Sequence, residues 1–318
     1  MYGSAQRKET IDDRHVSGAL HQAYWHKKAI KIVGIGRFPG PTEEGPGVNW
    51  TMSNLRVPED ARKKSPLTTY LPQFARELQI EKFFAPSPIE FNGRICNQSE
   101  LNISIPLGSS LSVRRGARAE GCLLYPDEGF LLSIAGCAII VAYMDGNSCL
   151  ETLNRTGVAH GGLKSFFNHK RVLIDNDSSP PKPHESVVGN LLSAINFTRE
   201  RAKDTHILIA YPIEAGKLVY DWNYPGDGDQ NRRMCEFFYS HLGPECFVDW
   251  DAHKTVKKFA LERIAIKQCT EAGVPEENIE VISSPAYYAN NGMTRWFETR
   301  GDPEFKDWRN LGIIARYT

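Results

Sequence analysis

A cysteine and a histidine in the middle of this sequence are the residues best placed to do chemistry. Cys137 directly follows Gly136, and His160 is followed by Gly161 and Gly162. A cysteine after a glycine at a strand turn can present its sulfur to a cleft, and its own backbone N–H can lie near a developing oxyanion. A cysteine paired with a histidine is the minimum for a thiolate nucleophile with its own base. The same pair also supplies two ligands of a common zinc site.

The elements that must position this pair are two apolar strands. Residues 129–142 predict a strand, a tight passage at Gly136 and then a second buried strand, which begins at Cys137. Residues 156–160 predict the other strand of the pair, which carries His160 and ends at two glycines. If the last two strands lie side by side, the Cys137 sulfur and the His160 imidazole come within hydrogen-bond reach. The alternative is that both residues are structural, because a cysteine in an apolar strand is usually a small core residue and a histidine at a strand end is usually held structurally.

Around these strands the pattern predicts an α/β fold, a layered sandwich around a mixed β-sheet. Residues 1–28 are polar and weakly patterned, which predicts a mobile or loosely docked N-terminal arm, and residues 29–318 are predicted to form a single domain. Helices are predicted over residues 67–78, 185–203 and 251–272, and further strands over 29–35, 206–211, 279–282 and 311–315.

Composition excludes several classes of protein. The formal net charge is zero, with 38 basic and 38 acidic residues, so a chain-wide field for nucleic acid or an anionic membrane is not expected. No apolar stretch approaches the length of a membrane span, and the N-terminus lacks the apolar region of a secretory signal. The seven cysteines are scattered without a CxxC pair, which fits reduced thiols in a cytoplasmic protein.

Several segments resemble the peptidoglycan-editing-factor (laccase-domain, multicopper polyphenol oxidoreductase-like) family. In order along the chain they are residues 117–141, 157–167 (GVAHGGLKSFF), 209–221, 273–281, 295–300 and the closing LGIIAR. Their order and rough spacing match that family over residues 85–318. The resemblance implies the laccase-domain fold and a zinc-bound site made of two histidines and a cysteine. It also implies one of three activities described in that family: amide hydrolysis in peptidoglycan editing, purine nucleoside phosphorolysis, or adenosine deamination.

Carried over residue by residue, this resemblance assigns Cys137 and His160 to the site. The place of the family's first histidine falls at residues 98–100, where Glu100 is the candidate metal ligand. The family's Asp before the cysteine is Gly136 here, and its Arg is Lys164. A Gly-Cys pair with a downstream histidine instead resembles the glutamine deamidases, namely the cytotoxic-necrotizing-factor-like toxins and the CheD-like chemotaxis deamidases, which use Cys and His without a metal.

The function expected from the sequence is hydrolysis of a C–N bond, an amide or amidine, in a small molecule or a protein. Cys137 is the expected nucleophile and His160 the expected base, with no cofactor. Four further residues are candidates for substrate binding: Gly136, Gly161, Lys164 and Arg300. One alternative is a zinc-dependent purine nucleoside phosphorylase or adenosine deaminase whose metal is held by Cys137, His160 and Glu100. A second alternative is a non-catalytic binding member of the family.

Overall fold

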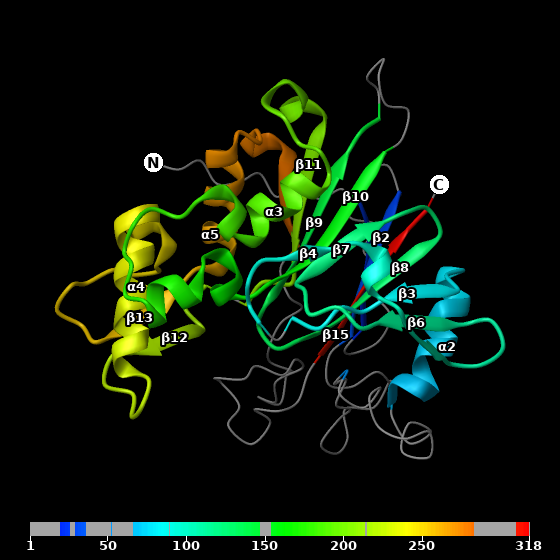
Figure 1. Cartoon of the computed structure of the whole chain (residues 1–318), viewed down its shortest axis with the longest axis horizontal. Coiled ribbons are helices and arrows are strands. Elements are labelled where there is room, and N and C mark those ends of the chain that lie inside the picture. The colour runs from blue at the N-terminus through cyan, green and yellow to red at the C-terminus, as the bar shows by residue number, and fades with distance from the viewer. Residues whose placement is uncertain are drawn as a thin grey trace. The chain divides into compact units, whose positions relative to one another are not determined.

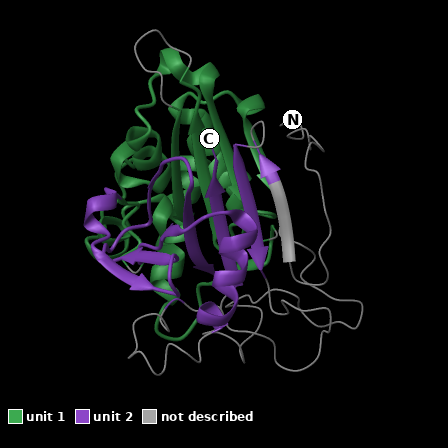
Figure 2. Ribbon diagram, turned by 90° about the vertical axis from the view of Figure 1, so that its right-hand side faces the viewer, with its two compact units in different colours: residues 1–6, 88–95, 136–284 green, residues 7–87, 96–135, 285–318 purple. Residues whose placement is uncertain are grey.

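The computed structural model describes residues 20–25, 29–35, 52, 66–88, 90–146, 154–213, 215–282 and 310–317 (Figure 1). The chain divides into two compact units (Figure 2). Unit 1 comprises residues 1–6, 88–95 and 136–284, and unit 2 comprises residues 7–87, 96–135 and 285–318. The single domain expected over residues 29–318 stays a prediction.

Unit 2 contains a seven-stranded mixed sheet. Its order is β1 (Leu20–Trp25), β2 (Ile30–Ile35), β15 (Asn310–Arg316), β8 (Glu128–Ile134), β3 (Lys82–Phe84), β6 (Ser112–Arg115) and β5 (Ile103–Pro106). Strand β3 runs parallel to both of its neighbours, whereas the other pairs whose register is known are antiparallel. The sequence places residues 20–25 in a loosely docked arm, but they pair in full register with β2.

The core of unit 2 lies under helix α2 (Pro66–Leu78). The sequence predicts this helix over residues 67–78. The helix buries Leu67, Leu71, Phe74 and Leu78 against apolar side chains of the sheet such as Phe83 and Leu131. Their spacing of three and four residues puts these side chains on one face of the helix. Unit 2 also holds the short strand β7 (Gly121–Leu124) and the 3₁₀ helix η2 (Gln98–Glu100), and the two-residue strand β4 (Ile95–Cys96) begins at its boundary with unit 1.

Unit 1 is built on four adjacent strands, in the order β14 (Ile279–Ile282), β11 (Thr205–Ala210), β9 (Ala138–Met144) and β10 (Arg155–Gly161). Strand β11 runs parallel to β14 and antiparallel to β9, which is antiparallel to β10. Every residue of β9 is buried, as its unbroken apolar run predicts for a central strand. Helices α3 (Val187–Ala194) and α5 (Leu261–Ala272) pack against these strands.

The remaining elements of unit 1 are mostly short. Helix α4 (Gly228–Leu242) packs against the hairpin of β12 (Leu218–Asp221) and β13 (Val256–Phe259). Short helices are η3 (Leu163–Phe166), η4 (Lys170–Ile174), η5 (Pro183–Glu185), η6 (Arg199–Asp204), η7 (Pro244–Cys246) and η8 (Glu276–Asn278). In the part of the chain that the structure describes, no helix is long and apolar enough to cross a membrane.

The helix predicted over residues 251–272 is wrong in its first half. Residues 256–259 form strand β13, and α5 begins only at Leu261. The strand alternates exposed and buried residues, but one inward position is Lys257. Its ammonium lies 4.3 Å from the ring centroid of Trp222 and 4.5 Å from that of Trp250, which stabilises a buried cation. A buried lysine hides the period of two that would have predicted a strand.

Helix α3 is shorter than predicted. The helix expected over residues 185–203 ends at Ala194, and Asn196 follows with a φ of +59°. Left-handed backbone of this kind ends a helix, and asparagine adopts it more readily than most residues. The start of the helix is capped by Ser186, whose Oγ accepts a hydrogen bond from the N–H of Gly189 at 3.0 Å.

Candidate functional site

Cys137 and His160 lie at the same end of the adjacent strands β9 and β10 of unit 1; Figure 1 shows these two strands. Cys137 immediately precedes β9, and His160 is the penultimate residue of β10. The antiparallel register pairs Gly161 with Ala138, so the end of β10 lies beside the start of β9. On the other side of β9, strand β11 ends where Ala210 is paired with Ile139. Three strand ends therefore lie next to one another at the cysteine, and the sequence predicts the adjacency of two of them, β9 and β10.

The turn before Cys137 depends on Gly136. Its φ is +92°, a conformation that side-chain-bearing residues rarely adopt. Its carbonyl oxygen accepts a hydrogen bond of 3.0 Å from the N–H of Ile213, just beyond the end of β11. This bond links the turn to the neighbouring strand end. Because the Gly136 carbonyl and the Cys137 N–H belong to one peptide group, the bond also fixes the backbone of Cys137.

Gly162 marks the point where the sulfur and the imidazole face the same space. A Cβ atom placed on Gly162 would lie 3.4 Å from Sγ of Cys137 and 3.3 Å from Nε2 of His160. It would also lie 2.7 Å from Cε1 of His160, closer than real Cβ contacts allow. Because Gly162 carries no side chain, the His160 ring and the Cys137 sulfur can both approach this point.

Burial separates Cys137 from the other described cysteines. Cys96, Cys122, Cys235, Cys246 and Cys269 are buried, whereas Cys137 is half-buried. Burial raises the pKa of the Cys246 and Cys269 thiols to about 12. These two are therefore protonated and inert at neutral pH, and Cys137 is the one described cysteine that is not buried.

Two aromatic residues of unit 1 have backbone conformations that carry no signal in the sequence. The Phe91 ring lies 6.2 Å, centroid to centroid, from the His160 ring at an interplanar angle of 47°. Tyr211 is fully buried directly after β11. Their φ angles are +45° and +57°, which costs a non-glycine residue about 1–2 kcal/mol each. Strain of this kind gathers at functional sites, and only the folded backbone reveals it.

The other predicted site residues are not all brought to this point. Lys164 lies close to the centre in sequence and is half-buried in η3. A Cβ atom on Gly161 would face Ile140 at 3.0 Å and the Phe166 ring at 3.4 Å, which is apolar core, so Gly162 and not Gly161 borders the reactive space. Arg300 lies outside the described residues.

Glu100, the predicted third zinc ligand, belongs to unit 2. Its Oε1 accepts a hydrogen bond of 2.9 Å from the N–H of Asn97 and thereby closes a capping box around η2. Across the described ranges, no cluster of three or more His, Cys, Asp or Glu side chains could hold a metal ion. Zinc sites in proteins use at least three protein ligands. The described donors around Cys137 and His160 therefore do not fit a zinc site.

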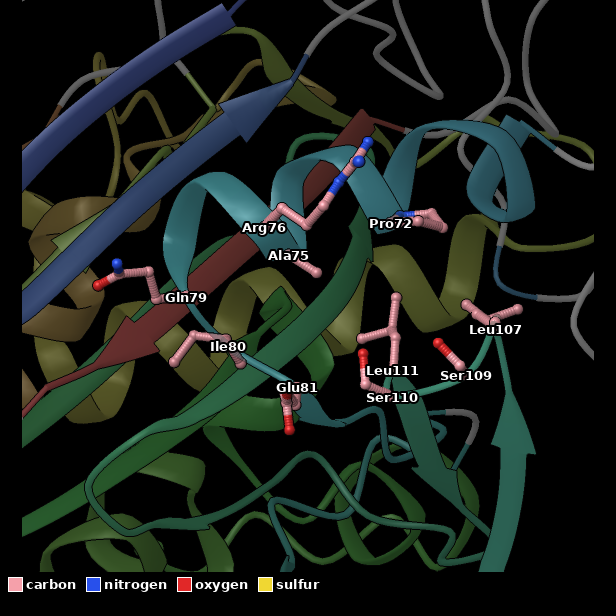
Figure 3. Close-up of a pocket in the computed structure, with 11 residues that line it drawn as sticks. Pro72, Ala75, Arg76, Gln79, Ile80, Glu81, Leu107, Ser109, Ser110 and Leu111 are labelled. Atoms are coloured by element: carbon pink, nitrogen blue, oxygen red, sulfur yellow. The ribbon is translucent and has the colours of Figure 1, made fainter.

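An open pocket of about 610 Å³ lies in unit 2, and its lining includes neither Cys137 nor His160. Figure 3 shows its lining, which comes from the second half of α2, residues 79–81 and the turn at residues 107–111 between β5 and β6. Its walls contain no cysteine and no histidine. The pocket therefore offers no nucleophile or base of the kind found in unit 1.

No protein-family model matches the sequence, and a search of the curated proteins gives no match. Solved structures do match in fold. YlmD from Geobacillus stearothermophilus superposes with a TM-score of 0.61 at 15% identity, covering 96% of this chain and 99% of that one. The hypothetical protein YfiH of Bacillus licheniformis superposes at 0.60 with 13% identity, over 96% and 98% of the chains. A Neisseria meningitidis protein of family model DUF152 gives 0.59 at 12% identity, over 94% and 100%. The chain therefore shares the fold of these three proteins, and the predicted α/β class with mixed sheets is confirmed.

Proposed function

We propose that this protein hydrolyses a C–N bond, an amide or amidine, with Cys137 as nucleophile and His160 as its base. The observation that carries the proposal is that Sγ of Cys137 and Nε2 of His160 both lie within 3.4 Å of the position that a Cβ atom on Gly162 would take. The partial exposure of Cys137 supports it further, because the other five described cysteines are buried, as cysteines in structural roles usually are. The names of the proteins with the same fold state no activity.

The reaction would begin with transfer of the Cys137 thiol proton to His160. The thiolate attacks the carbonyl or amidine carbon, and a tetrahedral adduct forms with a new C–S bond. The C–N bond then breaks as the imidazolium of His160 protonates the departing nitrogen, which leaves as ammonia or an amine. Water, deprotonated by His160, attacks the resulting thioester, or its imino counterpart from an amidine. The C–S bond breaks and the proton returns to sulfur.

The backbone is suited to stabilise the adduct. The hydrogen bond from Ile213 to the Gly136 carbonyl holds the peptide next to Cys137, so the Cys137 N–H is the proposed donor to the negative charge that develops on the substrate oxygen. A donor fixed before the reaction costs no reorganisation when charge develops. Lys164, two residues beyond Gly162, is the proposed contact for an anionic group of the substrate.

The donor set described above weighs against the zinc-dependent alternative, and the closeness of Sγ and the imidazole at Gly162 weighs against the non-catalytic alternative. One experiment distinguishes the proposed function from these two alternatives. It measures the zinc content of the protein and the rate at which iodoacetamide alkylates Cys137 at pH 7, with the modified residue located by peptide mass spectrometry. Cys137→Ala and His160→Asn are the test variants.

The proposed function predicts no bound zinc and alkylation of Cys137 at least about tenfold faster than that of free cysteine, an advantage lost in His160→Asn. Stoichiometric zinc that disappears in Cys137→Ala would favour the zinc alternative. If Cys137 reacts no faster than free cysteine and its rate does not depend on His160, the result would refute the role of Cys137 as nucleophile and favour the non-catalytic alternative.

A further inference from the structure

The segment Glu90–Gly93, called the Phe91 strap below, belongs to unit 1 although unit 2 supplies most of the chain on either side of it. Two side chains of unit 1 hold its backbone. Nδ1 of His169 lies 2.9 Å from the carbonyl oxygen of Phe91, so Nδ1 carries the hydrogen and donates it. Nδ2 of Asn190 donates to the carbonyl oxygen of Gly93 at 3.0 Å. The strap is therefore fastened at two successive points.

Gly93 allows the strap to approach the start of α3 closely. Its φ is +68°, and a Cβ atom there would lie 2.8 Å from the backbone nitrogen of Val187 and 2.9 Å from the carbonyl carbon of Ser186. No side chain fits between the strap and this backbone. The α3 start is itself capped by Ser186, so the strap rests on a well-defined helix end.

What these fastenings achieve is the placement of one aromatic ring. Phe91 has a strained φ of +45°, and such strain persists only where surrounding contacts impose it. The ring that results lies 6.2 Å from the His160 ring, within the range of aromatic pairs. The His169 and Asn190 bonds thus act on His160 through Phe91.

The physical need for such a ring follows from burial. His160 is only 4% exposed, so the imidazolium formed when it takes the Cys137 proton has little water to stabilise it. A cation that lies toward the face of an aromatic ring, within about 6 Å of its centroid, is stabilised by the ring quadrupole, most strongly where water is excluded. The same ring restricts the rotation of the imidazole, because the two rings pack against each other.

We infer that Phe91 is a positioning residue of the Cys137–His160 centre, held by His169 and Asn190 through the backbone of the Phe91 strap. This inference rests on the proposed function, because it concerns the step in which His160 becomes charged. It assigns Phe91 no contact with the reacting atoms. It identifies a loop from another part of the chain as the element that sets the reactivity of the pair.

The test uses the full-length chain and measures the pH profile of Cys137 alkylation by iodoacetamide between pH 5 and 9. Phe91→Leu keeps an apolar side chain but removes the π face, and His169→Leu removes the donor to the strap. His169→Asn is the matched variant, because its amide nitrogen stands close to the place of Nδ1 and can still donate. Tyr239→Leu controls for general loss of aromatic packing, because Tyr239 lies on α4 and its ring stacks on that of Trp250.

We expect Phe91→Leu and His169→Leu to slow alkylation at pH 7 between about threefold and tenfold and to move the profile toward that of a free thiol. His169→Asn should regain most of the rate, and Tyr239→Leu should match the parent. The double variant Phe91→Leu/His169→Leu should be alkylated no more slowly than Phe91→Leu alone, because both changes act on His160 through the position of the Phe91 ring.

Parent-like rates and profiles in Phe91→Leu and His169→Leu would overturn the inference, as would equal loss in His169→Asn and His169→Leu. If Phe91→Leu does not fold, the His169 pair and Asn190→Ala carry the same test from the strap's anchors. The proposed function fails separately: it falls if alkylation of the parent itself does not depend on His160, whatever the strap variants do.

Discussion

Replacing Gly162 with alanine tests the arrangement of the proposed centre most directly. The substitution adds one methyl group at the point that Sγ of Cys137 and the imidazole of His160 share. The φ of Gly162 is −80°, which alanine adopts without strain, so any effect comes from the methyl group and not from the backbone.

The magnitude follows from the contacts. The new Cβ would meet Cε1 of His160 at 2.7 Å, whereas ordinary contacts begin at 3.4 Å. The imidazole or the glycine backbone must therefore move by about 0.7 Å, and a displacement of about 1 Å in a reactive pair costs about 100-fold in rate. Crowding a packed site also costs about 1–3 kcal/mol of stability.

The assay compares the rate of Cys137 alkylation at pH 7, and amide hydrolysis once a substrate is known, with the free energy of unfolding in urea. Gly157→Ala is the control. It lies on β10, five residues before Gly162, and its added Cβ would also meet a side-chain atom at 2.7 Å, but that atom is Cδ1 of Leu191 in the core. A similar stability loss in both variants, with loss of reactivity only in Gly162→Ala, is expected. A folded Gly162→Ala protein with the parent's reactivity would refute the view that the pair meets at this point.

Three further outcomes follow from the structure. Gly136→Ala should cost about 1–2 kcal/mol in urea unfolding because of its φ of +92°, and it should slow alkylation of Cys137; unchanged unfolding would contradict the strain. In the native protein, mass mapping after iodoacetamide treatment at pH 8 should find Cys137 modified and Cys246 untouched, because burial raises the pKa of the Cys246 thiol to about 12; early labelling of Cys246 would show that the site opens. Hydrogen bonds from Ser179 and the guanidinium of Arg171 lower the pKa of Asp177 to about 2 from 3.8, so this carboxylate contributes stability that is present above pH 3.8 and lost as pH falls through 2. Acid titration followed by circular dichroism should therefore show Arg171→Leu losing structure at a higher pH than the parent, and coincident curves would count against that pairing.

Local pattern was sufficient for the strands that carry the proposed chemistry. The apolar run after Gly136 and the run ending at His160 form β9 and β10, and their adjacency follows from the antiparallel pairing of neighbouring strands. Local pattern was insufficient where a side chain plays an unusual part. Lys257 points inward between two tryptophan rings, so the strand around it looked like the start of a helix.

The residues that complete the site had no such local signature. Phe91 reaches His160 from a loop 69 positions earlier in the chain, and it does so through hydrogen bonds to its backbone and a φ angle that its residue type does not predict. Glu100 matched a family position in sequence, but its carboxylate caps its own short helix in unit 2. Contacts between distant segments depend on how the elements pack, and no pattern within one segment records them.

The sequence by itself therefore determined that Cys137 and His160 stand at the ends of two buried strands, because hydrophobic periodicity and glycine punctuation act over a few residues. Tertiary structure alone decided that Gly162, and not Gly161, lies against the sulfur and the imidazole, because Gly161 faces Ile140 and Phe166 while Gly162 follows the end of β10. It also decided that Phe91 stands beside the proposed base, because that position is imposed by hydrogen bonds from His169 and Asn190, which lie far away in the chain.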